Sequence, residues 1–123
     1  MEYRLIIPGR LPGLNEYISA ERSNRYKGAK LKSKSERIIS DEINAQLKGV
    51  KIKNPVEIHY LWVEHDMRRD RDNVAFAKKF VQDALVGAEV LENDDCKHVV
   101  GFSDRFEVDA KNPRIEVLIR EVK

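Results

Sequence analysis

The chain has 123 residues, of which 41% are hydrophobic and 36% are charged, and its formal net charge is +2. This length suits one domain, residues 1–123, with a single core, and the composition excludes a disordered chain. No apolar run approaches the roughly 18 residues of a membrane helix, and the first residues lack the apolar segment of a signal peptide, so we expect a cytoplasmic protein with no membrane partner. The only cysteine, Cys96, cannot form an internal disulfide, which agrees with a reducing compartment.

The first 34 residues are predicted to form a strand and a long basic loop. Apolar residues alternate over residues 2–8, as in a strand, and glycines and prolines over residues 9–13 end it. Residues 22–34 carry six cations and no acid, within a first half, residues 1–53, that has 12 Lys and Arg against 6 Asp and Glu. Such a run is typical of a mobile loop that orders on a polyanion by counterion release, although a solvated loop has the same composition. The cations, which are candidate DNA contacts, are Arg22, Arg25, Lys27, Lys30, Lys32 and Lys34.

The middle of the chain is predicted to contain a helix followed by the central strand. Apolar residues recur near helical spacing over residues 35–48, with Ser33 or Ser35 as the N-cap and Gly49 as the stop. A strand follows over residues 55–65, and because apolar residues occupy both of its faces we expect it to lie inside the sheet. Tyr60 and Trp62 on this strand should belong to the core.

Residues 72–88 contain the clearest helical pattern in the chain, with apolar residues at three- and four-residue steps. A turn over residues 87–95, a strand over 96–103 that includes Cys96, a hairpin loop over 104–112 and a strand over 113–122 complete the predicted elements. This order predicts an α+β fold, with a small mixed β-sheet of about four strands and two main helices packed on it.

Two pairs of aspartates flank this helix: Asp70 and Asp72, the first acidic cluster, and Asp94 and Asp95, the second acidic cluster. Alone, each pair has an ordinary explanation as a helix cap or a turn. Together, three or four carboxylates are costly to gather unless a cation neutralises them, and Mg²⁺ prefers such oxygen ligands. The arginines around the first cluster are candidate phosphate contacts: Arg68, Arg69 and Arg71.

A lysine on the same helix would complete such a site. In a continuous helix Lys79 lies about 20° from Asp72, where it would meet a phosphate, or it would pair with Asp83 one turn further on. A continuous helix would also hold the two acidic clusters roughly 25 Å apart. They would then meet only through a returning loop or through a partner subunit, and the sequence leaves both arrangements open.

Residues 66–100 resemble the RusA family of Holliday-junction resolvases, which is found in phages and prophages. The matching residues are Arg69-Asp70-Arg71-Asp72-Asn73, Lys78-Lys79, Asp83-Ala84-Leu85 and Asp94-Asp95. The first 30 residues are also similar to the family's loop after the first strand, through Pro8, Pro12, Asn15 and Tyr17.

The resemblance implies a homodimeric endodeoxyribonuclease that nicks two opposed strands of a four-way DNA junction during recombination and repair. It implies Mg²⁺ as the cofactor, with Mn²⁺ as a substitute. By the motif, Asp70, Asp72 and Asp95 are the metal ligands, with Asp94 as a neighbouring candidate. Lys79 matches the catalytic lysine, and Lys78 stays open because the spacing from the Asp-Asn pair is longer here than in shorter members.

Two other functions fit the same residues. A noncatalytic accessory protein would bind branched DNA through the basic run and use the acids as caps and turns. A metal-dependent hydrolase would act on free nucleotides. The three histidines are dispersed along the chain, and we expect each to be structural: His59, His65 and His98.

Overall fold

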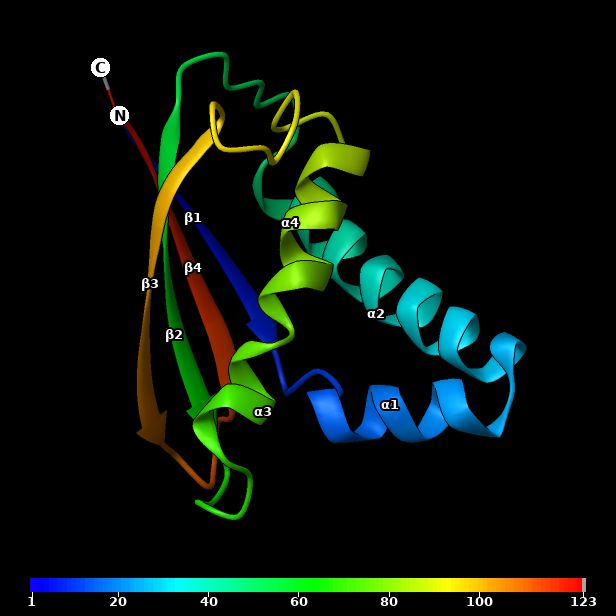
Figure 1. The fold of residues 1–123 in the computed structure, drawn as a ribbon. Helices are drawn as coiled ribbons and strands as arrows, with labels where there is room; N and C mark the ends of the chain where they lie inside the picture. Colours follow the sequence, from blue (N-terminus) through cyan, green and yellow to red (C-terminus); the bar gives the residue numbers. More distant parts are fainter. Residues whose placement is uncertain (123) are drawn as a thin grey trace.

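Four strands form one mixed sheet, and the helices lie on one of its faces (Figure 1). The computed structural model describes residues 1–122. In chain order the elements are β1 (Glu2–Pro8), α1 (Leu14–Ser23), α2 (Arg25–Gln46), β2 (Val56–Glu64), α3 (Arg71–Ala75), α4 (Lys78–Gly87), β3 (Val99–Val108) and β4 (Arg114–Glu121). The predicted α+β fold with a four-stranded mixed sheet is confirmed, although α1, α2 and α4 make three longer helices where the sequence predicts two.

The sheet has the strand order β1-β4-β2-β3. Strand β4 pairs antiparallel with both β1 and β2, whereas β2 and β3 run parallel, so β2 lies inside the sheet as predicted. Parallel neighbours need a crossover connection, which α3 and α4 provide. As a result β2 and β3 start at the same end of the sheet, where Val56 pairs with Val99. They finish at the other end, where Glu64 pairs with Val108.

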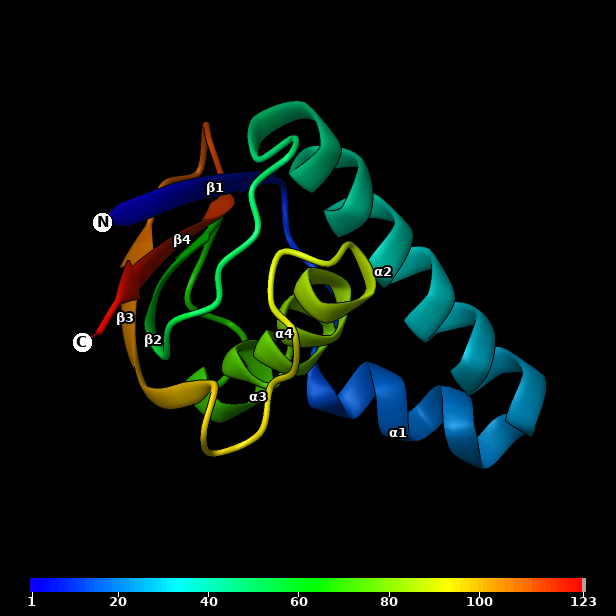
Figure 2. The same cartoon turned by 90° about the horizontal axis from the view of Figure 1, so that it is seen from above.

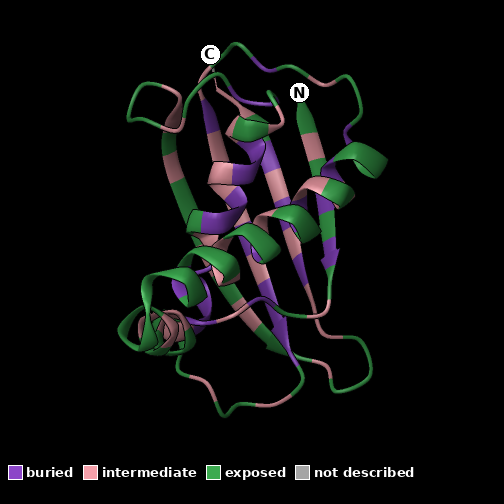
Figure 3. Cartoon of the chain, turned by 90° about the vertical axis from the view of Figure 1, so that its right-hand side faces the viewer, coloured by how far each residue is buried: buried purple, intermediate pink, exposed green. Residues whose placement is uncertain are grey.

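The core lies between the sheet and the helices. Tyr60 and Trp62 are each 1% exposed, and their rings stack with centroids 5.3 Å apart, which confirms them as core residues. Figure 3 shows the buried residues on the inner faces of the elements, while much of the helical surface turned outward is exposed. The other large buried side chains come from β1, β2, β4, α2 and α4 and include Leu5, Ile7, Ile39, Ile43, Ile58, Phe80, Leu85 and Ile119.

The predicted loop over residues 9–34 is wrong, because most of this segment is helical and α1 and α2 meet in a V-shaped helical hairpin (Figures 1 and 2). Asn24 forms the corner. Its backbone N–H donates to the carbonyl of Ala20 at the end of α1, and its side chain accepts a 2.9 Å hydrogen bond from the N–H of Lys27 at the start of α2. One residue thus caps both helices, and Asn24, rather than either predicted serine, begins α2.

A glycine allows the two helices of the hairpin to approach closely. At Gly28 of α2, an added Cβ would lie 2.7 Å from Cγ of Glu21 on α1. The tip of the hairpin is therefore a packed and capped corner.

The helix predicted over residues 72–88 is interrupted. It divides into α3 and α4, and the backbone between them bonds in the tighter three-residue pattern, with N–H of Ala77 donating to Val74 at 3.2 Å and N–H of Phe80 donating to Ala77 at 3.0 Å. The ring of Phe76 fills the break, with centroids 5.5 Å from Tyr17 and 5.4 Å from Phe80. Asp72 and Lys79 consequently lie on different helices and do not share one strip.

Strand β3 also differs from its prediction. It starts at Val99, so Cys96 is exposed in the preceding turn and does not belong to the strand predicted over residues 96–103. It then runs to Val108, through much of the predicted hairpin loop.

The two edges of the sheet are protected differently. At β1, the side chain of Gln46 on α2 bonds both the N–H and the carbonyl of Ile6, each at 2.7 Å. At β3, no residue of the described part of the chain makes such bonds to the outer edge. Unpaired edge strands are templates for pairing with another chain. Within residues 1–122, no helix combines the length and the apolarity needed to cross a membrane.

Candidate functional site

The first acidic cluster lies where the chain leaves β2 and enters α3. Asp70 is exposed at the N-cap of α3 and makes no side-chain cap bond. Asp72 is exposed two residues later, and its Oδ1 accepts a 3.0 Å hydrogen bond from the N–H of Asn73. Neither carboxylate has an ion-pair partner in the part of the chain that the structure describes. Their oxygens are therefore available to a cation, which is what a hard divalent metal requires.

Arg69 holds the backbone ahead of this cluster. Its guanidinium donates two 2.8 Å hydrogen bonds to the carboxylate of Glu64 and a 3.0 Å bond to the carbonyl of Leu11. The Arg69 side chain is only 12% exposed. Arg69, a predicted DNA contact, thus faces inward, and its hydrogen bonds stabilise the turn between β2 and α3.

Asn73 ties the other side of the cluster to the base of the helical hairpin. Its Oδ1 accepts a 2.9 Å hydrogen bond from the N–H of Asn15 in the first turn of α1. The two segments touch at Gly13, where an added Cβ would lie 2.6 Å from Oδ1 of Asn73. The first acidic cluster and the hairpin are therefore parts of one rigid corner.

Two neighbouring hollows open beside the first acidic cluster. Asp70 lines one and Asp72 the other, and both are bordered by Arg71 and Phe106. The guanidinium carbon of Arg71 lies 5.3 Å from the centroid of the Phe106 ring. The exposed Arg71 thus stands between the carboxylates, where it can meet a phosphate.

Lys78 also lines the Asp72 hollow, but an ion pair holds it there. Its Nζ lies 2.5 Å from Oδ2 of Asp104 and 4.1 Å from the centroid of Phe102. The other Asp104 oxygen accepts a 2.8 Å bond from Nε1 of Trp62. Asp104 lies beyond the strand predicted over residues 96–103, although its alternation with Phe102 and Phe106 indicates that all three share the helix-facing side of β3.

The second acidic cluster lies in the turn before β3, and Asp95 is already heavily bonded there. Its Oδ1 accepts the backbone N–H groups of Lys97 and His98, each at 3.1 Å, and lies 2.6 Å from Nδ1 of His98. The side-chain bond is the largest cause that lowers the pKa of Asp95, and the same bond raises the pKa of His98 above its ordinary 6.5. His98 is therefore a positioning group for this turn.

Asp94 faces the lysine of α4. Its Oδ2 lies 3.7 Å from Nζ of Lys79, which donates a 3.0 Å hydrogen bond to Asp83. The bond to Asp83 is the main cause that raises the pKa of Lys79. The predicted pair of Lys79 with Asp83 is confirmed, and its phosphate contact stays a prediction. Lys79 accompanies the second acidic cluster rather than the first.

The two acidic clusters do not meet within one protomer. The first follows the end of β2 and the second precedes the start of β3, and the parallel pairing of these strands puts those points at opposite ends of the sheet. The nine residues of β2 span roughly 25 Å, and the turn before β3 folds back only far enough for Asp94 to reach Lys79 of α4. Figure 1 shows the turn before β3 near one end of α4 and α3 near the other. Among residues 1–122, no group of three His, Cys, Asp or Glu side chains could hold a metal ion.

The basic candidates divide into outward and inward groups. Five of the predicted contacts are exposed on the helical hairpin, namely Arg22, Arg25, Lys27, Lys30 and Lys34. Lys32 instead turns toward α4, with Nζ 3.6 Å from Asp83. Arg68 is 90% exposed and lies 3.7 Å from Asp66.

Strand β3 exposes an unusual amount of apolar surface. Val100, Phe102 and Val108 are each about half exposed, at 49%, 56% and 52%. Phe102 and Val108 share one face of the strand, because side chains an even number of residues apart lie on the same side, and Val100 lies where the register between β2 and β3 shifts. This stripe runs along the sheet edge whose backbone is unpaired.

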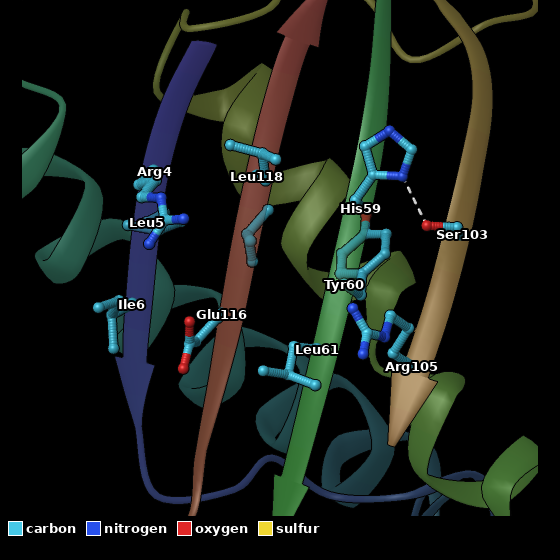
Figure 4. A pocket seen from close by; sticks show the side chains of 11 residues that line it. Arg4, Leu5, Ile6, His59, Tyr60, Leu61, Ser103, Arg105, Glu116 and Leu118 are labelled. Atoms are coloured by element: carbon cyan, nitrogen blue, oxygen red, sulfur yellow. Dashed lines mark hydrogen bonds between the residues drawn. The ribbon is translucent and has the colours of Figure 1, made fainter. Parts of the chain in front are cut away.

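A further hollow lies on the sheet face that the helices leave open (Figure 4). Nδ1 of His59 lies 2.5 Å from Oγ of Ser103, and its Nε2 lies 3.4 Å from Glu57 without forming a hydrogen bond. Arg4 and Arg105 line the same hollow. It is remote from both acidic clusters and mixes charges of both signs, so we assign it no part in the site.

Comparison with known proteins adds no family. No protein-family model matches the chain, and no curated protein matches it. The function must therefore be argued from the geometry.

Proposed function

We propose that this protein is a Mg²⁺-dependent, structure-selective endodeoxyribonuclease of the RusA type, which acts as a homodimer and nicks opposed strands of a four-way DNA junction. The residues of the first acidic cluster support this proposal, because their carboxylates are exposed, two residues apart and free of protein cations. The basic hairpin fixed beside them supplies the electrostatic attraction that a polyanionic substrate needs.

The observation that carries the proposal is that the first cluster follows the end of β2, whereas the second precedes the start of β3, at the other end of the β3 edge of the sheet. Two copies whose β3 strands pair antiparallel about a twofold axis would continue the sheet from one protomer into the other. The start of β3 in one protomer would then lie near the end of β3 in its partner. The second cluster of each chain would approach the first cluster of the other, so one dimer would hold two equivalent composite sites.

The exposed stripe on β3 supports the same arrangement. An antiparallel pair of β3 strands would cover Val100, Phe102 and Val108, which otherwise stay in contact with water. Burying a valine or phenylalanine side chain stabilises an interface by about 1.5–3 kcal/mol. At the opposite edge, Gln46 already bonds both backbone groups of Ile6, which makes that edge a poorer template.

The residues would divide the chemistry as follows. Asp70 and Asp72 of one protomer, with Asp94 or Asp95 of the other, would hold the ion. Asp95 would offer mainly Oδ2, which accepts one 3.3 Å hydrogen bond from Nδ2 of Asn93, whereas Oδ1 has three partners. When bound, Mg²⁺ or Mn²⁺ supplies a Lewis acid that lowers the pKa of an attacking water. Lys79, 61% exposed beside Asp94, would neutralise charge on the phosphate as its P–O bond breaks.

A cleavage assay on a four-way junction tests this function. The wild-type protein should make paired, symmetric nicks with Mg²⁺ and none with EDTA. Asp70→Asn and Asp72→Asn should each reduce the rate by more than the roughly 10- to 100-fold typical of an outer-shell metal partner, while junction binding persists. Asp41→Asn on the exposed surface of α2 is a matched control and should cut normally.

Wild-type protein that binds the junction but never cuts it would overturn the proposal in favour of a noncatalytic branched-DNA-binding protein. The absence of a three-residue metal group within one protomer is the observation that favours this rival. Turnover of free nucleotides with junctions left intact would favour a nucleotide hydrolase instead.

A further inference from the structure

The tip of the helical hairpin carries an exposed tyrosine whose side chain does not contribute to packing. Tyr26, in the first turn of α2, is 85% exposed. The other three tyrosines have partners: Tyr3 bonds Glu121, Tyr17 packs on two phenylalanines, and Tyr60 stacks on Trp62. No hydrogen bond or ring contact of Tyr26 is found within residues 1–122.

Cations surround this ring on the same side of α2. At 100° per residue, Lys30, Lys34 and Arg37 lie within about 80° of Tyr26, and all four are exposed. The opposite side of the helix is buried at Gly28, Ser35, Ile39 and Ile43. No acid occurs between residues 22 and 34. The outward strip is therefore a positive stripe with one aromatic ring at its end, a surface that complements a nucleic-acid strand with an accessible base.

The hairpin presents this ring in a fixed place. Asn24 caps both helices at the tip, and Asn15 ties the base of α1 to Asn73 of the first acidic corner. The ten residues of α1 put the tip about 15 Å from that corner. Along a DNA strand this distance corresponds to about four or five base steps.

We infer that Tyr26 is an aromatic platform that stacks on an unstacked base of the substrate, while the cations of the strip hold the neighbouring phosphates. The inference rests on the proposed function and deepens it, because it explains how branched DNA is preferred over plain duplex. Bases in a duplex are covered by their neighbours, whereas bases near a branch point can be exposed to a protein ring.

Binding measurements with Mg²⁺ replaced by EDTA test this inference independently of cleavage. The probes are a four-way junction and a linear duplex of equal length. Loss of a base–aromatic stack should make Tyr26→Ala roughly 5- to 100-fold weaker on the junction and leave duplex binding within about twofold. Tyr26→Phe should behave as wild type, and Tyr26→Leu, which is apolar but cannot stack, should behave as Tyr26→Ala.

A charge variant supplies the contrast. Lys30→Ala with Lys34→Ala should weaken both DNAs alike and reduce the salt dependence of binding by about one unit of slope per lysine. A junction with 2-aminopurine placed up to about five steps from the nick should change its emission with wild type and Tyr26→Phe, and not with Tyr26→Ala.

Equal losses of Tyr26→Ala on both DNAs, no loss on either, or no junction preference in wild type would each overturn the inference. Its failure is distinct from failure of the proposed function. If the protein never nicks DNA, Tyr26→Ala can still weaken junction binding more than duplex binding. If the protein nicks symmetrically but Tyr26→Ala binds and cuts as wild type, only the stacking role of Tyr26 is rejected.

Discussion

The first acidic cluster leaves its carboxylates free of protein cations, whereas the second has already committed its oxygens to protein donors. Asp70 and Asp72 project beside open hollows. Asp95 has four hydrogen-bond partners, three at Oδ1 and one at Oδ2, and Asp94 faces Lys79. The difference indicates that the first cluster is a receptive half-site and the second a preformed turn that brings its own lysine. In the proposed site each half needs the other, and the open edge of β3 is where a second copy would supply it.

The largest effect should follow from breaking the contact between the halves. Val100→Lys combined with Val108→Lys puts two charges on the apolar stripe of β3. Each lost valine contact is worth about 1.5–3 kcal/mol, so dimer affinity should fall at least about 100-fold, and junction cleavage with it. Analytical ultracentrifugation checks the mass. Ile6→Lys, on the edge closed by Gln46, is the matched control and should stay dimeric. A monomer that still cuts would contradict the composite site.

The two adjacent lysines should separate catalysis from folding. Lys79→Ala removes an exposed ammonium beside the second cluster and should lower the cleavage rate about 100- to 1,000-fold with little change in thermal stability. Lys78→Ala breaks a pair with Asp104 in which both side chains are about one fifth exposed, and should cost about 1–2 kcal/mol of folding free energy. Parallel melting curves and cleavage rates measure both. The reverse pattern would move the phosphate contact to Lys78.

Two glycines test how rigidly the first cluster is held. Gly13→Ala forces a methyl group to within 2.6 Å of Asn73 Oδ1 and should destabilise the fold by about 1–3 kcal/mol. Gly87 of α4 has open space around it, so Gly87→Ala should be neutral or stabilise the helix by up to about 1 kcal/mol. Denaturant unfolding distinguishes the two, and equal effects would mean that the Asn73 corner yields easily.

The smallest effect concerns the preformed turn. The contact with Asp95 raises the pKa of His98 above 6.5, so NMR titration in metal-free buffer should show its imidazole protonated at higher pH than in Asp95→Asn. A raised folded pKa contributes stability that is fully present below 6.5 and is lost as the pH rises through the folded value. The change should be small because the pair is at the surface. Identical titration curves for the two proteins would show that the contact is absent in solution.

The sequence predicted the fold class and the central strand, because apolar patterns report burial directly. It did not predict the helical hairpin, since α1 has no fully buried residue and the cations of α2 conceal its narrow buried side. It also joined α3 and α4, because the apolar repeat continues through a break that Phe76 stabilises by contacts with distant residues. Asp104 was missed for the same kind of reason, since its partners Lys78 and Trp62 lie on other elements.

For the candidate site, the sequence predicted which residues could bind a metal or a phosphate. It did not predict which of them lie together in the fold. The spacing of Asp70 and Asp72 made them a local pair in any fold. The distance from the second cluster depends on whether β2 and β3 run parallel, and strand direction is a property of the whole sheet. The sequence left open a returning loop or a partner subunit as the way to bring the clusters together. The parallel pairing of β2 and β3 favours the partner subunit.

Mixing two inactive proteins tests the shared site most directly. One carries Asp70→Asn and Asp72→Asn, the other Asp94→Asn and Asp95→Asn, and the two are co-refolded so that subunits exchange. In a heterodimer with composite sites, the intact first cluster of one chain meets the intact second cluster of the other, so one of the two sites is restored. The mixture should therefore nick one strand per junction although each protein alone is inactive. A mixture as inactive as its components, with heterodimers confirmed to form, would contradict the account.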